Sequence, residues 1–249
     1  MLELKPERFG LSDYGSQPIA ICGKAFVADM SGALYWPAEK MLIVADLHLG
    51  KGAAFAARGT QMLPPYDTRD TLLRLVRVID AYDVQTVVAL GDSFHDSRSF
   101  DLMDQDDRKI LEVLQDERAW IWVSGNHDPE ISQLAGGERA DVLSIGGIAL
   151  RHEPRIGPVT HEIAGHLHPA AKVSLYGHTI RRPCFIGNSR RLILPAFGSF
   201  TGGLNVLDEA FEPLFGHDGF SIWLLGEDGL YPVATRRLSP DRNSFGALK

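Results

Sequence analysis

The apolar residues in the first half of the chain follow two alternating patterns. Continuous apolar runs at 41–45, 86–90 and 120–123 are typical of strands that are buried on both faces. Between these runs, residues 67–81 and 106–115 carry their apolar side chains close to helical spacing. The order of strand, helix, strand, helix and strand predicts a parallel sheet connected by crossover helices.

The rest of the chain favours short strands and turns. Residues 1–39 predict strands that pack on the core, and after about residue 137 the helical pattern fades. The later strands are expected at 142–145, 148–151, 162–165, 172–176, 184–186, 192–194 and 220–225. Because no linker-like stretch interrupts the pattern, we predict one α/β domain over residues 1–249. It would contain two packed sheets with flanking helices, and residues 240–249 would form a C-terminal tail.

Composition narrows the class of protein. The chain has 249 residues, 45% of them hydrophobic, which is enough for a full core. Its start lacks the basic and apolar segments of a signal peptide, and no apolar run is long enough to cross a bilayer. A cytoplasmic protein without a membrane partner is therefore expected. Two distant cysteines, Cys22 and Cys184, predict neither a disulfide framework nor a thiolate metal site.

The net charge limits how the chain can meet nucleic acid. A charge of −7 argues against a protein that coats nucleic acid with its whole surface. It is compatible with a nuclease, because divalent ions in the site would supply local positive charge. Three arginine pairs either extend that positive field or lie as solvated surface residues: Arg151 and Arg155, Arg181 and Arg182, and Arg190 and Arg191.

Polar motifs follow the three buried strands at the point where each strand ends. Asp46 and His48 follow the first strand, Asp92 follows the second, and Asn126 and His127 follow the third. In parallel α/β sheets, ligands bind in the crevice beyond the carboxyl ends of the strands. These five side chains are therefore expected to meet in one crevice.

Two further motifs complete a ligand set for metal ions. His152 and the pair His166 and His168 add three imidazoles to two carboxylates and one amide oxygen. Such a set suits two adjacent divalent ions that flank a phosphate ester during its hydrolysis. Asp92 is expected to bridge them, because each of its oxygens can bind one ion. Three glycines precede ligand candidates and predict sharp turns at strand ends: Gly91, Gly125 and Gly165.

The ordered motifs resemble the signature of the calcineurin-like metallophosphoesterase superfamily, whose fold is a four-layer αββα sandwich. The resemblance implies one metal held by Asp46, His48, Asp92 and His168 and another held by Asp92, Asn126, His152 and His166. It also implies that His127 contacts the phosphate and protonates the leaving oxygen. Asp128 would orient the His127 imidazole, and His95 would support it, as in the nuclease branch of the superfamily.

A closer resemblance covers most of the chain. The segments similar to the ligase-associated DNA damage response endonucleases are 44–59, 63–68, 91–96, 151–154, 164–169 and 194–205. These endonucleases are bacterial metallophosphoesterases encoded beside an ATP-dependent DNA ligase, a helicase and an exonuclease-like protein. The resemblance implies a manganese-dependent phosphodiesterase that cuts single-stranded DNA in repair. The ligand types alone also suit iron, cobalt, nickel or zinc.

Two basic residues, Lys51 and Arg58, follow the first motif on a short helix. They either bind a phosphate of the substrate or pair with Asp67 or Asp70. Asp67 is also expected to cap the long helix that it begins. The segment 195–205, rich in glycine and aromatic residues, forms either part of the rim around the site or simple turns.

Rival interpretations remain at this stage. The isolated ligand has two candidates, His152 and His161. The chain is alternatively a phosphomonoesterase or a nucleotide pyrophosphatase of the same superfamily, or a non-catalytic scaffold that keeps the fold. A scaffold would be expected to have lost ligands or the catalytic histidine, and this chain keeps them all.

Overall fold

The computed structural model describes residues 15–57, 59, 66–175 and 177–241, and the first sheet within them has seven strands. The strands lie in sequence order from β1 to β7; β1 to β4 pair antiparallel, and β4 to β7 pair parallel. They are β1 (Gln17–Ile21), β2 (Lys24–Ala28), β3 (Leu34–Trp36), β4 (Met41–Val44), β5 (Thr86–Leu90), β6 (Ala119–Val123) and β7 (Glu138–Ala140).

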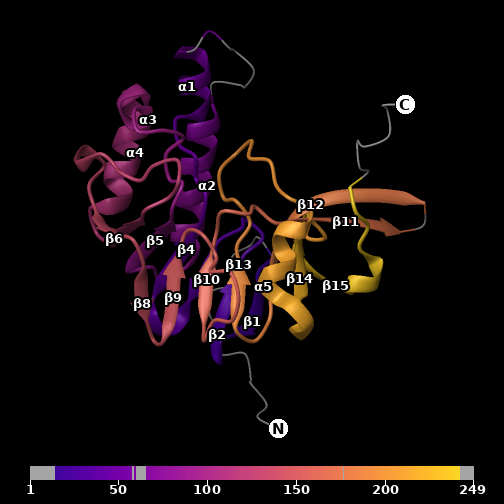
Figure 1. The fold of residues 1–249 in the computed structure, drawn as a ribbon. Coiled ribbons are helices and arrows are strands. Elements are labelled where there is room, and N and C mark those ends of the chain that lie inside the picture. Colours follow the sequence, from indigo (N-terminus) through magenta and orange to yellow (C-terminus); the bar gives the residue numbers. More distant parts are fainter. Residues whose placement is uncertain (1–14, 58, 60–65, 176, 242–249) are drawn as a thin grey trace.

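The second sheet comes from the later part of the chain. Its order is β15-β14-β12-β13-β10-β9-β8, and β11 pairs with β12 in a ribbon that extends away from the body of the protein (Figure 1). β9, β10 and β13 pair parallel, and the other pairs are antiparallel. The strands are β8 (Leu143–Ile145), β9 (Ile148–Arg151), β10 (Glu162–Ala164), β11 (Ala170–Leu175), β12 (His178–Gly187), β13 (Arg191–Ile193), β14 (Ser221–Leu225) and β15 (Leu230–Val233).

Helices flank the two sheets. The α-helices are α1 (Lys51–Ala57), α2 (Asp67–Ala81), α3 (Ser99–Leu102), α4 (Gln105–Gln115) and α5 (Glu212–Phe215). Short 3₁₀ helices lie at η1 (Pro37–Glu39), η2 (Gln133–Ala135), η3 (Glu209–Phe211), η4 (Gly216–Asp218) and η5 (Thr235–Arg237). None of the helices in the described part of the chain has the length and apolar character needed to cross a membrane.

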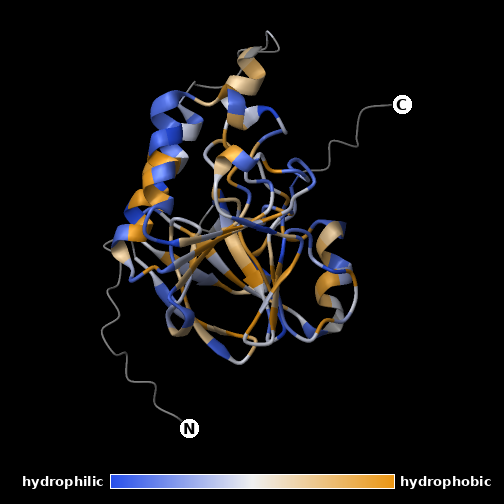
Figure 2. Ribbon diagram, turned by 90° about the vertical axis from the view of Figure 1, so that its left-hand side faces the viewer, coloured by the Kyte–Doolittle hydropathy of each residue, from blue (hydrophilic) through white to orange (hydrophobic). Residues whose placement is uncertain are grey.

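Three apolar clusters hold the layers together. Side chains of α2 and α4 pack on one face of the first sheet, with Leu72 and Trp122 among them. The inner faces of the two sheets pack on each other through residues such as Ile43 and Phe185. α5 covers the outer face of the second sheet. Figure 2 shows the hydrophobic residues concentrated on the central strands. The predicted α/β fold of two packed sheets with flanking helices is confirmed.

The central strands and the long helices lie where the sequence predicts them, and several other elements depart from the prediction. α2 has the predicted bounds, but its N-cap residue is Tyr66, without a side-chain cap. The expected cap by Asp67 is wrong, because its Oδ2 accepts a hydrogen bond from Gly52 N at 2.9 Å instead. β7, β15, α3 and α5 were not predicted, since each is only three or four residues long and depends on packing for its stability.

Candidate metal centre

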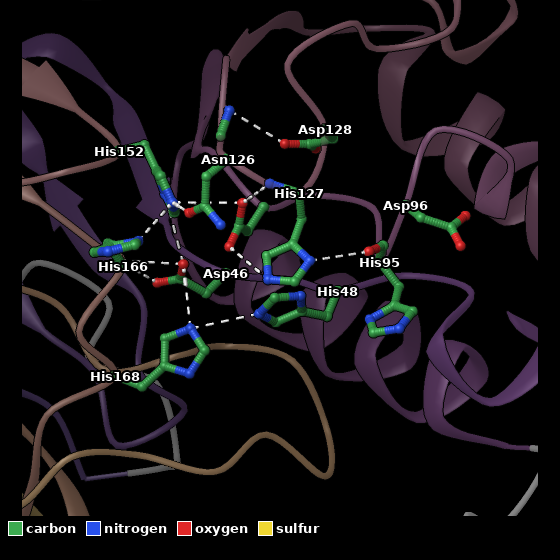
Figure 3. A network of polar contacts seen from close by, with 12 residues as sticks. Asp46, His48, His95, Asp96, Asn126, His127, Asp128, His152, His166 and His168 are labelled. Atoms are coloured by element: carbon green, nitrogen blue, oxygen red, sulfur yellow. Dashed lines mark hydrogen bonds and ion pairs between the residues drawn. The ribbon is translucent and has the colours of Figure 1, made fainter. Parts of the chain in front are cut away.

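The carboxyl ends of strands from both sheets meet at one place. Asp46, Asp92 and Asn126 follow β4, β5 and β6 of the first sheet, and His152 and His166 follow β9 and β10 of the second. Figure 3 shows the side chains of Asp46, Asn126, His152 and His166 turned toward one another. The crevice expected from the parallel strand order therefore receives ligands from two sheets rather than one.

Ligand atoms in this crevice form two groups. Asp46, His48 and His168 make one group, and Asp92, His152 and His166 make the other; within each group one atom per residue lies within 4.8 Å of the others. In the first, His168 Nε2 lies 3.4 Å from His48 Nε2 and 3.3 Å from Asp46 Oδ1. Each group has the oxygen and nitrogen atoms needed to hold a divalent ion.

The second group also reaches Asn126. His152 Nε2 lies 2.9 Å from Asn126 Oδ1, 3.0 Å from His166 Nδ1 and 3.4 Å from Asp92 Oδ1. Asp46 joins the groups, because His166 N donates to its Oδ2 at 2.9 Å. Every residue predicted to bind metal thus lies in this one cluster.

Most of these ligands sit on backbone that glycine normally occupies. Asp46 (55°), His48 (47°), Asp92 (45°), His166 (72°) and His168 (44°) all have positive φ. Such conformations cost about 1–3 kcal/mol per residue and persist only where the surroundings hold them. Here two hydrogen bonds join the first two strand ends, from Asp46 N to Gly91 O (3.2 Å) and from His48 N to Asp92 O (2.9 Å). The strained turns direct the side chains into the crevice.

Backbone carbonyls orient two of the imidazoles. Leu90 O lies 2.9 Å from His152 Nδ1, and Gly202 O lies 3.1 Å from His168 Nδ1. If each Nδ1 donates its proton there, each Nε2 keeps its lone pair for a cation. His48 Nδ1 is buried and has no hydrogen-bond partner among the described residues.

Burial favours the neutral form of two imidazoles, and the neutral form is the one that binds metal. Desolvation lowers the pKa of His48 to about 3, against the opposing attraction of Asp46. Desolvation also lowers the pKa of His166, and His152 adds to this effect. For His168 burial acts in the same direction, but the hydrogen bond and charge of Asp46 outweigh it and raise the pKa.

Comparison with known proteins shows which family this chain resembles. A family model described as calcineurin-like phosphoesterase matches residues 39–158. The crystal structure of the nuclease MPE from Pseudomonas putida is similar over 88% of this chain and 100% of its own, with 27% identity and a TM-score of 0.70. The chain is similar to the calcineurin-like phosphoesterases in sequence over this segment, and to a nuclease in fold over most of its length. The predicted superfamily is confirmed, and with it the prediction of a phosphoester hydrolase.

Two other comparisons do not bear on the assignment as a phosphoesterase. A crystal structure of a Vps29 double mutant from Entamoeba histolytica covers 80% of this chain and 95% of its own, but with 16% identity and a TM-score of 0.30. No curated protein matches the chain in sequence.

His127 and His95 stand beside the ligands of this phosphoesterase. The two rings stack with centroids 5.8 Å apart, and the main-chain carbonyl of His95 lies 3.2 Å from His127 Nδ1. His127 Nε2 lies 3.9 Å from Asp92 Oδ2, and the side chain is 45% exposed. One ring nitrogen of His127 is therefore held by the backbone, while the other faces the metal ligands and is open to a substrate (Figure 3).

The structure corrects the expected role of Asp128. Its Oδ2 accepts hydrogen bonds from Ser93 N (2.7 Å) and Phe94 N (3.0 Å), and its Oδ1 accepts one from Gly125 N (3.1 Å). Burial raises the pKa of this carboxyl to about 6. None of its described contacts reaches the His127 imidazole, so Asp128 holds the turns after β5 and β6 together rather than orienting that ring.

The other sequence candidates fall in different places. His161 precedes β10, at the end of the strand opposite to the ligands, so His152 is the histidine in the cluster. Lys51 Nζ donates to Phe200 O at 3.2 Å, and this contact ties α1 to the rim. Arg58 lies outside the described residues.

The arginine pairs do not form the unopposed positive field that was one interpretation of the sequence. In the described part of the chain, five of these six arginines have carboxylate partners that offset their charge. The contacts are Arg151 and Arg191 with Glu162, Arg181 with Asp241, Arg182 with Glu227, and Arg190 with Asp218. That makes five paired side chains on four carboxylates, and the positive charge near the site has to come mainly from metal ions.

The segment 195–205 makes direct contacts with two candidate metal ligands, which the sequence did not predict. Gly198 N donates to Asp46 O at 3.0 Å, and Gly202 O orients His168. Arg74 of α2 donates to Phe197 O and lies over the Phe197 ring. These contacts are mostly to backbone atoms, which carry no residue-type signal, so only the glycine and aromatic content pointed to this segment.

Gly165 shows why small residues precede the ligands, and it leads to a prediction. A Cβ at this position would lie 2.6 Å from Asp46 Oδ2 and 2.8 Å from Ala45 Cβ. Gly165→Ala is therefore expected to displace Asp46, lower stability by about 1–3 kcal/mol and weaken metal binding about 10–100-fold. Thermal unfolding with and without added manganese measures both effects.

Gly229→Ala is the matched control, because its nearest atom would be Gly15 O at 3.9 Å. It should unfold and bind metal like the parent. If Gly165→Ala also behaved like the parent, close approach would not be the reason for glycine there. Of the three predicted sharp turns, only the one at Gly91 has positive φ (72°), so Gly125 and Gly165 serve close approach instead.

Proposed function

We propose that this phosphoesterase is an endonuclease that hydrolyses phosphodiester bonds of single-stranded DNA with two divalent ions. The observation that carries the proposal is the pair of ligand groups with the open Nε2 of His127 beside them. The similarity to a nuclease over the whole length of that relative supports nucleic acid as the substrate class.

The donor set fits two divalent ions. Imidazole nitrogens and carboxylate oxygens converge in each group. The buried Nδ1 of His48 has no hydrogen-bond partner among the described residues, so Nε2 is the nitrogen that faces the site. Asp46, His48 and His168 would hold one ion; Asn126, His152 and His166 would hold the other; and Asp92 would contact both. Two such ions supply a nucleophile at neutral pH and positive charge beside the phosphate. We propose manganese, which the oxygen and nitrogen ligands accept and the resemblance in sequence favours.

The residues of the chain have separate tasks in this proposal. His127 donates a proton to the oxygen that leaves phosphorus, and its position next to Asp92 puts Nε2 at the edge of the ligand cluster. The carbonyl of His95 accepts from Nδ1 and so fixes the orientation of the donor. Lys51 contributes positive charge at the rim, which suits a flanking phosphate.

The preference for unpaired strands is supported by Phe200. This residue lies between Gly198, which contacts Asp46, and Gly202, which contacts His168. It has a φ of 58° and is 48% exposed. A bulky residue is strained at this φ, and an exposed aromatic ring gives up the stabilisation that burial would provide. An exposed aromatic ring beside a phosphate site is the kind of surface on which unpaired bases stack.

Phe200→Ala is therefore expected to raise KM for single-stranded DNA by about 5–100-fold, because each stacked base contributes roughly 1–3 kcal/mol. KM for a small aryl diester should change much less. Steady-state kinetics on both substrates measures the difference. Phe200→Tyr should restore the parent KM, and Tyr231→Ala, which removes another half-exposed aromatic ring, should have no effect. An unchanged KM for DNA in Phe200→Ala would remove the stacking role.

Circular single-stranded DNA tests the function as a whole. The parent should nick the circle and hydrolyse a model diester with manganese present, and an elemental scan should find about two ions per chain. If it hydrolysed only a phosphomonoester or a nucleoside pyrophosphate, a rival enzyme class would replace the proposal. If it hydrolysed none of these with any divalent ion, the scaffold interpretation would replace it.

The biological setting belongs to the same proposal. We infer a role in DNA repair in the cytoplasm of a bacterium, together with an ATP-dependent ligase, a helicase and an exonuclease. The support is the resemblance of the segments around the ligands to the ligase-associated endonucleases. Co-purification of the chain with that ligase, and sensitivity of a deletion strain to DNA damage, are the measurements that test it.

A further inference from the structure

A second pocket lies directly beside the metal centre. It has a volume of about 140 Å³, and its walls include the ligand His168 and residues of the rim and of β12: Arg181, Arg182, Thr201, Gly202 and Gly203. The pocket therefore shares one wall with the place where a phosphate would be cleaved. The proposed roles of the metal ligands and of His127 do not use it.

Arg181 is the arginine of this pocket that also contacts the rim. Its Nη2 donates to Gly203 O at 2.6 Å, and the neighbouring Gly202 O lies against the His168 ring. Its Nε donates to Asp241 Oδ2 at 3.2 Å. A guanidinium has five N–H donors in a planar fork, so three are left over from these two contacts. The side chain is 40% exposed, which keeps those donors accessible.

Arg182 has a different partner. Its Nη2 donates to Glu227 Oε1 at 2.6 Å, in the turn between β14 and β15. Both arginines line the pocket, and of the two Arg181 is the one that also donates to the rim, at Gly203 O. Arg181 is therefore the anion-binding candidate of the pair.

We propose that Arg181 binds the phosphate adjacent to the one being cleaved, so that this pocket is a subsite for a neighbouring nucleotide. The proposal rests on the function proposed above and adds the position of the strand next to the metal centre. Arginine suits this task, because its fork binds two phosphate oxygens at once. Asp241 competes for the same guanidinium and limits its net charge.

Chromogenic nucleoside diesters test the subsite. Two pairs are needed: a thymidine 5′-(p-nitrophenyl phosphate) with and without a 3′-phosphate, and a thymidine 3′-(p-nitrophenyl phosphate) with and without a 5′-phosphate. The chemistry is the same within each pair, so the ratio of the two KM values isolates the neighbouring phosphate. In the parent, this phosphate should lower KM about tenfold in one of the two pairs.

Three variants decide the outcome. Arg181→Ala should lose the tenfold gain. Loss of the hydrogen bond to Gly203 O can also slow hydrolysis, but it would slow both members of a pair equally and leave their ratio unchanged. Arg190→Ala removes an exposed arginine that pairs with Asp218 at 3.3 Å on the other end of the sheet, and it should keep the gain. Asp241→Asn should enlarge it, because the guanidinium is then released from its carboxylate; this variant also tests the proposal if Arg181→Ala does not fold.

Salt dependence adds a second measurement on an oligonucleotide. A lost phosphate contact should reduce the slope of log kcat/KM against log salt by about 0.7 in Arg181→Ala. The proposal is overturned if the neighbouring phosphate gives the parent no gain, if the gain survives in Arg181→Ala, or if it falls in Asp241→Asn. Failure of the parent to cut DNA, with the gain on the diesters intact, would contradict the DNA substrate and leave the nucleotide subsite in place.

Discussion

Asp92→Asn is expected to abolish hydrolysis, lowering kcat/KM for a model phosphodiester by about 10³-fold or more. Asp92 supplies a carboxylate to the group that includes His152 and His166. Losing its charge removes several kcal/mol of electrostatic stabilisation, and every 1.36 kcal/mol is a factor of about ten in rate. Elemental analysis should find fewer ions per chain than in the parent.

The fold should survive this change, since an asparagine oxygen can still accept the hydrogen bond from His127 N, which is 2.9 Å long with Asp92 Oδ1. Circular dichroism and thermal unfolding check that it does. Asp107→Asn is the matched control, because Asp107 is also a buried carboxylate but pairs with Arg69 on α2 and α4. It should keep the ion content and rate of the parent. Parent-like ion content and rate in Asp92→Asn would contradict the proposed metal centre.

His127→Ala is expected to lower kcat by about 10²–10⁴-fold for a substrate whose leaving group is an alkoxide, as in DNA. Nδ1 of His127 is held by the His95 carbonyl, and Nε2 is the free nitrogen beside Asp92. A p-nitrophenolate leaves without a proton, so the loss for a p-nitrophenyl diester should be much smaller. Comparing the two leaving groups under saturating substrate separates proton donation from binding.

The ion content of His127→Ala should match that of the parent, because His127 is not in either ligand group. His178→Ala is the control. This exposed histidine begins β12, where it pairs with Leu175, and it contacts none of the described residues of the cluster. Equal losses for both leaving groups would contradict a proton donor and point to a role in binding the phosphate.

The sequence predicts the central architecture because hydrophobic periodicity is strong there. The runs at 41–45, 86–90 and 120–123 became β4, β5 and β6, and α2 has its predicted bounds. Where an element is too short to show an apolar pattern, the sequence did not predict it. β15 and α5 cover only four residues each, too few to carry a pattern. β12 runs well beyond the apolar stretch 184–186, because its first half is exposed, carries no apolar run and is paired with β11.

The residues of the candidate site were easier to predict than their contacts. Motif order indicated the candidate metal ligands, and the structure brings them together. The role of Asp128 was misjudged, because a buried carboxylate after a histidine looks the same in sequence whether it binds the ring or backbone amides. The carbonyls of Leu90 and Gly202, which orient two imidazoles, have no sequence signature at all.

The candidate metal ligands come from both sheets, so the centre forms only when both halves of the chain are present and folded. The segment that matches the family model ends at residue 158, before His166 and His168. A polypeptide cut or stalled near that point lacks two of the imidazoles and the strand that presents them. If the proposed metal centre is the active site, hydrolysis requires the second half of the molecule to have docked on the first. Unfinished or damaged copies are then expected to be inactive.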